Sequence, residues 1–327
     1  MENVRFYFAP LEGVTDSIFR RAHHDLFPGL DKYYIPFISP TQHLTMTSRE
    51  QRAVAPEENA GIPAVPQVLT RRAAHFVHMA RLLADVGYAE VNLNLGCPSG
   101  TVTAKGKGAG MLRAPDDLRP FLDEVFADPP VAISIKTRIG YDSPEEWPDL
   151  LSNFRQYPIA ELIVHPRTRQ EFYKGRPHRE IMATLPEAGL PYAYNGDLNT
   201  AAACRAFLEE YPDTPALMLG RGLITDPALV REFRGGAPLT LGELRAFHDR
   251  LFADYSRQWH ASAVLGHMRE IADYFLCCFE DPKRVRKALR KARTLDDYAA
   301  AMERLFAEHA MREQPEFYFP FDRETDQ

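Results

Sequence analysis

The stretch Asn92-Leu93-Asn94-Leu95-Gly96-Cys97-Pro98 joins the end of an apolar run to a tight turn that carries a cysteine. A cysteine at the end of a strand has a fixed backbone and a thiol that can face a cleft, which suits chemistry. The alternative is a small apolar filler, because free cysteine is usually buried and inert. The surrounding sequence decides between these two interpretations.

The apolar run at 90–95 is the fourth of eight that alternate with helical patterns. These predicted strands cover 4–9, 32–37, 63–68, 90–95, 131–137, 161–165, 192–195 and 216–219. Strands alternating with helices indicate a parallel sheet with right-handed crossovers. Eight such units fit a closed (β/α)8 TIM barrel of about 250 residues. A doubly wound open sheet is the alternative, but it usually has fewer strands and an early dinucleotide-binding loop.

The Gly235-Gly236-Ala237-Pro238 run interrupts this alternation, and the pattern from 241 to about 309 is helical throughout. We therefore expect three parts. They are a catalytic α/β barrel over 1–236, a smaller C-terminal all-α helical-bundle domain over 241–310, and an irregular tail over 311–327.

Composition excludes several classes of protein. The chain of 327 residues has 45% hydrophobic and 26% charged residues and a net charge of −6, as in a globular protein that does not bind nucleic acid indiscriminately. It has no apolar run long enough for a membrane span and no signal-peptide pattern. Its four cysteines do not make a disulfide framework, which favours a cytoplasmic location. Ligand spacings typical of metal sites are missing, so we expect no metal and no membrane partner.

Polar residues follow seven of the eight predicted strands. The carboxyl ends of barrel strands share one face, where reactive groups lie, so we expect an active site there. Lys136, inside an otherwise apolar strand, could form a Schiff base or neutralise an anionic cofactor. Asn195-Gly196-Asp197 and Gly220-Arg221-Gly222 suit a phosphate group, although two tight turns would use the same glycines.

Residues 283–293 hold seven basic residues and no acidic one. Val285, Ala288, Leu289 and Ala292 recur at helical spacing, which would leave the cations on the opposite face. A solvated face is the usual meaning of such a run, but its one-sidedness in an acidic protein favours an anionic partner such as a phosphodiester backbone. We expect this stripe to be extended toward the barrel mouth by Arg167, Arg169, Lys174, Arg176 and Arg179.

Taken together, these motifs resemble those of the tRNA-dihydrouridine synthase family. The resemblance covers nearly the whole chain. It is carried by 9–16, by the cysteine motif at 92–98 with Gly108-Ala109, by 136–140, by 165–173, by 195–198 and by 220–222. Leu11 stands where the family usually has methionine. Pro166 stands where a small residue is usual, which removes a backbone donor.

The resemblance implies bound FMN, NADPH as reductant, and tRNA as substrate of a monomeric enzyme. Cys97 takes the catalytic position. The FMN-binding positions are Pro10, Leu11, Glu12, Gln67, Lys136, His165, Asn195, Gly196, Asp197, Gly220 and Arg221. The positions where the family contacts the target uridine are Asn94, Arg138 and Tyr173. From the charge pattern we also expect tRNA contacts from Arg167, Arg169, Lys283, Arg286, Lys287 and Arg290.

This assignment is consistent with the chemistry. Reduction of the uracil C5=C6 bond requires a hydride at C6 and a proton at C5, and a thiol with an ordinary pKa of about 8.5 can act as the acid. Three alternatives remain from the sequence. They are a flavin barrel acting on a free small molecule, an aldolase-type lyase using Lys136, and a non-catalytic RNA-binding protein.

Overall fold

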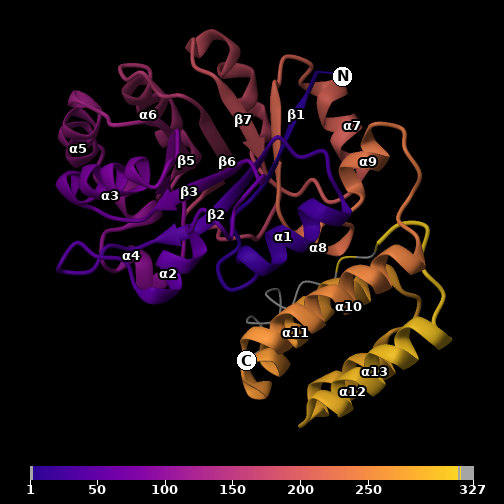
Figure 1. The fold of residues 1–327 in the computed structure, drawn as a ribbon. Helices are drawn as coiled ribbons and strands as arrows, with labels where there is room; N and C mark the ends of the chain where they lie inside the picture. Colours follow the sequence, from indigo (N-terminus) through magenta and orange to yellow (C-terminus); the bar gives the residue numbers. More distant parts are fainter. Residues whose placement is uncertain (1–2, 316, 318–327) are drawn as a thin grey trace. The chain divides into compact units, whose positions relative to one another are not determined.

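The computed structural model describes residues 3–315 and 317, and within them eight parallel strands close into a barrel in sequence order (Figure 1). The strands are β1 (Arg5–Phe8), β2 (Lys32–Ile38), β3 (Ala64–Val68), β4 (Glu90–Leu95), β5 (Ala132–Gly140), β6 (Leu162–Thr168), β7 (Tyr192–Asn195) and β8 (Ala216–Leu219). All eight predicted strands are confirmed. β5 and β6 each run three residues further than predicted, so Arg138 and Arg167 are strand residues rather than loop residues.

Helices connect these strands and continue beyond the last one. They are α1 (Ser17–Leu26), α2 (Ser48–Ala53), α3 (Ala73–Asp85), α4 (Gly100–Thr103), α5 (Pro115–Ala127), α6 (Trp147–Phe154), α7 (Ala201–Glu210), α8 (Arg221–Thr225), α9 (Leu229–Phe233), α10 (Leu241–Gln258), α11 (Ala261–Phe275), α12 (Lys283–Lys291) and α13 (Leu295–Glu308). Short 3-10 helices are η1 (Gly108–Arg113), η2 (Pro144–Glu146), η3 (Arg179–Thr184), η4 (Pro186–Ala188) and η5 (Leu276–Cys278).

The chain forms two compact units, each built from several segments. The barrel unit comprises the described residues of Met1–Pro10, Leu30–Asp197 and Ala206–Leu219. The helical unit comprises those of Leu11–Gly29, Leu198–Arg205 and Gly220–Gln327. The consecutive division into 1–236 and 241–310 stays a prediction, and most of the predicted tail lies outside the described residues.

A buried ion cluster fills the amino-terminal end of the barrel, where β1 and β2 begin. Glu161 is only 1% exposed, yet its carboxylate accepts a hydrogen bond from Tyr7 Oη at 2.7 Å and pairs with Arg5 at 3.0 Å. Lys32 Nζ lies 3.1 Å from Glu161 and 2.7 Å from Glu90. These charges balance one another at this end, and the opposite, carboxyl end is left available for chemistry.

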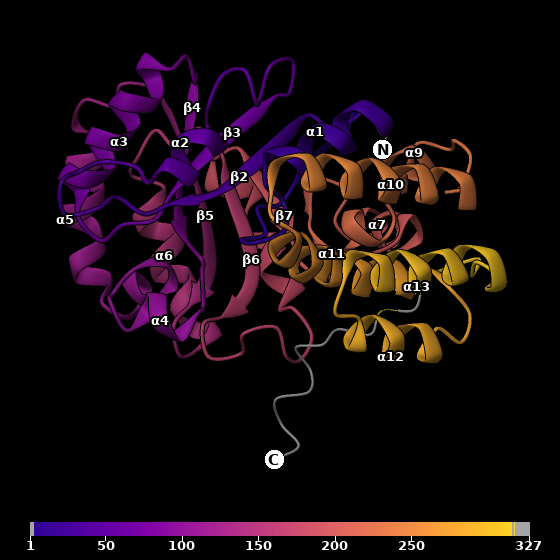
Figure 2. The same ribbon diagram turned by 60° about the horizontal axis from the view of Figure 1, so that its bottom comes forward.

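The helical unit has its own aromatic core. Phe247 of α10 packs edge-on against Phe19 of α1 at 5.4 Å and against Phe27 at 5.5 Å. Tyr255 Oη also donates to the Asp16 carboxylate at 2.8 Å, which fixes α10 to the start of α1. Figure 2 shows α12 and α13 side by side, and these two helices pack against each other. The predicted C-terminal helical region is therefore confirmed.

No helix among the described residues combines the length and apolar character that crossing a membrane would require.

Candidate active site

A chain of buried polar side chains links three neighbouring strands inside the barrel and ends at Asn94, near the carboxyl end. Gln67 Nε2 donates to Asn92 Oδ1 at 2.7 Å, and Asn92 Nδ2 donates to Ser134 Oγ at 2.8 Å. Asn94 Nδ2 donates to Gln67 Oε1 at 2.6 Å. Because each amide nitrogen faces an acceptor, the orientation of the Asn94 amide is set, and its oxygen points the other way.

The Asn94 oxygen holds the turn that carries Cys97. Oδ1 accepts hydrogen bonds from the backbone N–H of Gly96 at 3.1 Å and of Cys97 at 2.9 Å. Arg138 Nε donates to the Gly96 carbonyl at 2.9 Å from the neighbouring strand. The turn is therefore fixed from both sides. The structure describes all four cysteines, and Cys97 is half-buried whereas Cys204, Cys277 and Cys278 are buried.

Gly108 closes the loop that follows Cys97. Its φ is +57°, and a Cβ atom there would lie 2.9 Å from the Cys97 carbonyl oxygen and 3.0 Å from the Cys97 Cβ. Ala109 N donates to the same carbonyl at 3.1 Å. Only glycine allows this close approach without displacing the cysteine.

We expect Gly108→Ala to lower the free energy of unfolding by about 1–3 kcal/mol, because it combines left-handed backbone strain with overpacking. Gly100→Ala is the matched control, since a Cβ at Gly100 meets nothing within 4 Å. Urea unfolding of the two variants gives the comparison. Equal stabilities would show that the loop relaxes around the added methyl group.

Lys136 of β5 provides a titratable cation in the same region. It lies next to Asn94 in the β4–β5 register. Burial, followed by repulsion from Arg138, lowers the pKa of the Lys136 ammonium to about 7, against a weaker opposite effect of Cys97. An ammonium in such surroundings is stabilised by an anionic ligand.

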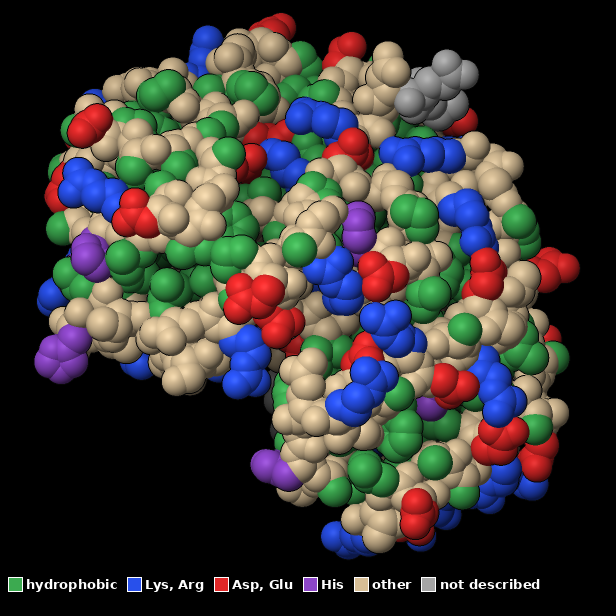
Figure 3. Space-filling view, in the orientation of Figure 1, with side chains coloured by type: hydrophobic (Ala, Val, Ile, Leu, Met, Phe, Trp, Pro, Cys, Tyr) green, Lys and Arg blue, Asp and Glu red, His purple; other side chains and the backbone are tan. Residues whose placement is uncertain are grey.

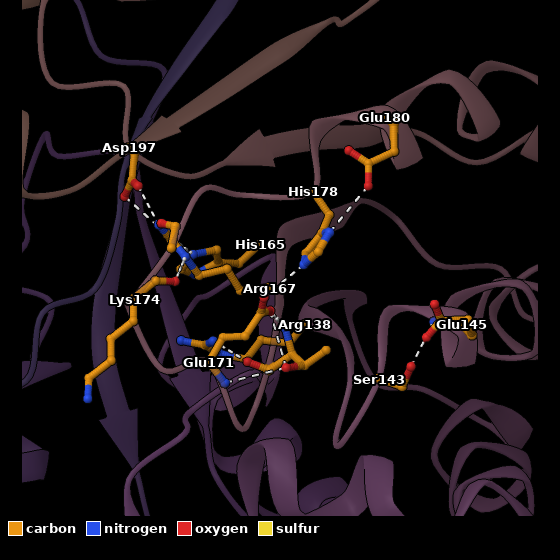
Figure 4. Close-up of polar contacts among 12 residues, drawn as sticks. Arg138, Ser143, Glu145, His165, Arg167, Glu171, Lys174, His178, Glu180 and Asp197 are labelled. Atoms are coloured by element: carbon orange, nitrogen blue, oxygen red, sulfur yellow. Dashed lines mark hydrogen bonds and ion pairs between the residues drawn. The ribbon is translucent and has the colours of Figure 1, made fainter.

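Arg167 is buried among strand ends, with an exposed fraction of 1%. All five of its N–H groups have acceptors (Figure 4). They are the carbonyls of Lys174 and Gly175 at 3.1 and 2.6 Å, both Asp197 carboxylate oxygens at 3.1 and 2.5 Å, and His165 Nε2 at 3.1 Å. The prediction that Arg167 extends an exposed phosphate-binding stripe is therefore wrong. Arg167 instead joins β6 to the residues that follow β7 and to the loop after β6.

This contact defines the protonation of His165. A guanidinium can only donate, so His165 Nε2 must accept and carries no hydrogen. The ring hydrogen is then on Nδ1, and the imidazole is neutral. His165 is 7% exposed, and its ring centroid lies 6.0 Å from that of Tyr173. The side chain therefore offers a neutral N–H donor rather than a charge.

We expect nitrogen NMR of the histidine-labelled protein at neutral pH to show one ring locked with its hydrogen on Nδ1. His165→Gln should remove that signal, which assigns it, and Arg167→Met should release the ring into a mixture of tautomers. A hydrogen on Nε2, or a doubly protonated ring in the unmodified protein, would contradict the assignment.

The loop after β6 carries Tyr173, and the Glu171 carboxylate joins the start of this loop to His178. Glu171 accepts from Thr168 N at 2.6 Å and faces His178 Nε2 at 2.8 Å. Burial opposes the charged form of His178, but its bonds to Glu171 and Glu180 prevail and raise its pKa. Tyr173 is 47% exposed, and the Arg138 guanidinium lies 5.3 Å from its ring centroid. An aromatic face is thus displayed beside the cysteine turn.

The remaining predicted cofactor residues divide between the two units. Asn195 Nδ2 donates to the Met218 carbonyl at 2.8 Å, which links β7 to β8. Gly196 and the half-buried Pro10 also belong to the barrel unit. Leu11, Glu12, Gly220 and Arg221 belong to the helical unit, and Gly220 precedes the first residue of α8. Their contact with a cofactor stays a prediction.

The basic helix α12 behaves as its sequence pattern predicts. Val285 and Leu289 are buried, whereas Lys283, Lys287 and Arg290 are exposed. Arg286 is the exception, because its Nε lies 3.4 Å from the Asp273 carboxylate. These cations line a cavity of about 620 Å³, together with Asp281, Pro282 and Arg312. Arg312 is a member of this group that the sequence pattern did not reveal.

Sequence reasoning included Asn92 in the cysteine motif but assigned no separate role to Asn92, Ser134, Glu171 or His178. The spacing of Asn92 and Asn94, two residues apart in a strand, was a usable signal because it places both on one face. No comparable signal marked Ser134. Among the described residues, no group of three or more His, Cys, Asp or Glu side chains could hold a metal ion.

Comparison with known proteins gives a consistent result. The family model for dihydrouridine synthase matches residues 7–308. A probable tRNA-dihydrouridine synthase of Staphylococcus epidermidis is 30% identical over 270 residues, 77% of this chain and 79% of the relative. tRNA-dihydrouridine synthase B of Pasteurella multocida is 26% identical over 273 residues, 83% of this chain and 78% of the relative.

Solved structures share the barrel. The old yellow enzyme homologue of Zymomonas mobilis aligns with a TM-score of 0.52 at 14% identity, covering 72% of this chain and 90% of that one. Morphinone reductase aligns with a TM-score of 0.50 at 13% identity, covering 72% and 87%. At these identities the likeness concerns the fold alone.

Proposed function

Because the chain belongs to the dihydrouridine synthase family, we propose that it reduces a specific uridine of tRNA to 5,6-dihydrouridine with bound FMN and NADPH. The observation that carries the proposal is the turn of Cys97, which Asn94 and Arg138 fix at the carboxyl end of a closed barrel. The tRNA-modifying relatives and this geometry support the same reaction class. Cytoplasm, where tRNA is modified, is the proposed location.

The barrel residues fit an anionic redox cofactor. Lys136 is a cation with a lowered pKa, and the charged groups that act on it are Arg138 and Cys97 rather than a carboxylate. Gln67, His165, Asn195, Gly196 and Asp197 follow the neighbouring strand ends. When bound, reduced FMN supplies the hydride for C6 of the uracil, and NADPH renews it. Lys136 would bind the negatively charged edge of the cofactor. His165 would donate a hydrogen bond to the cofactor from its neutral ring N–H.

Cys97 would give the proton. Its thiol delivers the hydrogen of Sγ to C5 of the base, and solvent then restores the thiol. The Asn94 bonds fix the backbone of the turn from which the Cys97 side chain projects, and positioned proton transfer needs such a fixed support. His165 is poorly suited to this role, because its ring is neutral and a neutral imidazole N–H is a much weaker acid than a thiol.

The base would be received beside Tyr173. Tyr173 presents an exposed ring for stacking, and Arg138 lies behind it. A uridine stacked within folded RNA cannot reach a barrel, so it must be extruded. Asn94 and Arg138 would also contact the base directly. In the structure both side chains already hold the cysteine turn.

The tRNA body would be held by the cations of α12. Lys283, Lys287 and Arg290 are exposed on the face of α12 opposite its buried residues, and Arg286 and Arg312 line the same cavity. Clustered cations of this kind bind phosphates and make affinity depend on salt. Arg169 remains a proposed contact from the barrel unit. It lies 4.6 Å from the Phe172 ring centroid and is half-buried.

We expect Cys97→Ala to keep bound flavin and NADPH oxidation and to lose most uridine reduction, by about 10²–10⁴-fold, because only the acid is removed. The measurement is dihydrouridine formed in unmodified tRNA. Loss of the yellow colour would mean that Cys97 supports the cofactor instead.

Turnover of a free pyrimidine without tRNA activity would favour a small-molecule reductase. Borohydride trapping of a carbonyl compound on Lys136 in a colourless protein would favour a lyase.

Flavin binding should weaken as the pH rises from about 7 to about 9. In the flavin-free protein the Lys136 ammonium has a pKa of about 7, and an anion beside it raises that value, so binding takes up a proton in this window. The apparent Kd, followed by quenching of flavin fluorescence, should rise by up to about tenfold per pH unit. Lys136→Met should abolish this slope. A pH-independent Kd in the unmodified protein would exclude Lys136 as the charge partner.

A further inference from the structure

The barrel unit has an exposed cluster of cations in addition to the stripe on α12. We call the side chains of Arg71, Arg72, Lys105 and Lys107 the Lys105 patch. Arg71 and Arg72 precede α3, and the two lysines lie between α4 and η1. The segments are close together, because a Cβ at Gly106 would lie 3.4 Å from Arg71 Cδ.

The cations of the Lys105 patch lack acidic partners. Among the described residues, no carboxylate forms an ion pair with Arg71, Arg72 or Lys105. Lys107 Nζ donates to Ser39 Oγ at 2.7 Å. Burial and then the repulsion of Lys105 and Arg71 lower the Lys107 pKa, with Glu50 opposing them. The Glu50 carboxylate is itself occupied by backbone N–H groups of Ser39 and Thr47.

Several exposed arginines elsewhere in the protein do have acidic partners. Lys and Arg side chains are interspersed with Asp and Glu over the face drawn in Figure 3. In the helical unit, Arg231 pairs with Glu243 at 2.6 Å, and Arg245 pairs with Glu303 at 2.5 Å. Like charges left together on an acidic protein repel one another, and an anionic partner relieves that repulsion.

The Lys105 patch is close to the cysteine turn both along the chain and in space. Its lysines lie in the loop that returns to Cys97, where Ala109 N donates to the Cys97 carbonyl at 3.1 Å. Gly108 makes the approach too close for any other residue, with φ +57° and a virtual Cβ 2.9 Å from that carbonyl. A ligand that binds the loop is therefore held with respect to the proposed acid.

We infer that the Lys105 patch binds backbone phosphates of the tRNA on either side of the extruded uridine, next to Cys97. This inference rests on the proposed function and adds to it a surface on the barrel unit. Extrusion of a base brings its flanking phosphates to the rim of the pocket, and unpaired arginine and lysine side chains suit phosphate oxygens. The 2′-phosphate of NADPH has the same chemistry, and the experiment separates the two sources.

The test uses the flavin-loaded full chain with Arg71→Ala, Arg72→Ala and Lys105→Ala combined. We expect its affinity for unmodified tRNA to fall on the order of tenfold or more near physiological salt. The slope of log affinity against log salt should decrease by about one for each phosphate that the variant no longer binds. Reduction of the flavin by NADPH in the absence of tRNA should keep its rate and its NADPH dependence.

A matched pair of single variants controls for loss of charge. Arg72→Ala removes a patch cation at the start of α3, where its side chain makes no capping hydrogen bond. Arg81→Ala removes an exposed cation from the same helix, roughly 13 Å further along its axis. Only Arg72→Ala should weaken tRNA binding and lower the salt slope. Equal effects of the two would mean that net charge alone is responsible, and would overturn the inference.

Two further outcomes would also overturn it. Unchanged tRNA binding by the triple variant would remove the patch from the interface. A raised KM for NADPH with unchanged tRNA affinity would assign the patch to the dinucleotide. Failure of the proposed function is recognised separately, since the unmodified protein would then form no dihydrouridine in any tRNA.

Discussion

The site depends on one hydrogen-bonding arrangement, in which the Asn94 side-chain oxygen accepts from the backbone N–H groups of Gly96 and Cys97. An amide can rotate by half a turn and exchange its oxygen and nitrogen, which would leave the turn facing two donors. Gln67 prevents this, because its oxygen accepts from Asn94 Nδ2 at 2.6 Å. Buried polar networks of this kind are rigid only when every member is satisfied. The position of the cysteine is therefore set by residues that never need to touch a substrate.

The buried side chains of Arg138 and Arg167 also fix the site, by hydrogen bonds between neighbouring strands. Arg138 bonds the Gly96 carbonyl and the Thr168 carbonyl, at 2.9 and 2.7 Å, and so links the cysteine turn to the end of β6. Arg167 links β6 to Asp197 and to the loop that carries Tyr173. A guanidinium suits this task because its donors spread in a plane and it remains charged at any working pH. The strand ends at the barrel mouth are thus joined by arginines whose N–H groups bond to acceptors within the protein.

The sequence predicted the architecture well because it rests on repeated, local patterns. Eight apolar runs with helical spacers give a closed barrel in sequence order, and every run is a strand. Which side chains of a helix are buried was less predictable, as α1 shows. Its segment contains Arg20 and His23, which look like surface residues but are buried, and burial lowers the pKa of His23 to about 3. Their burial depends on packing against other elements, which the helical period alone does not reveal.

The candidate site was predicted in its residue types and less well in their roles. Gln67, Asn94, Arg138 and His165 do meet near Cys97 or at adjoining strand ends, as expected for polar residues at parallel strand ends. What the sequence could not provide was the direction of each hydrogen bond. Arg167 and Lys105 are both cations in the sequence, yet Arg167 has all five N–H groups occupied and Lys105 has no acidic partner among the described residues. The difference arises because β6 continues through Arg167 and buries it, whereas Lys105 lies in a loop. A cation buried by a strand organises the protein, and a cation exposed on a loop next to the reacting group is available to a ligand.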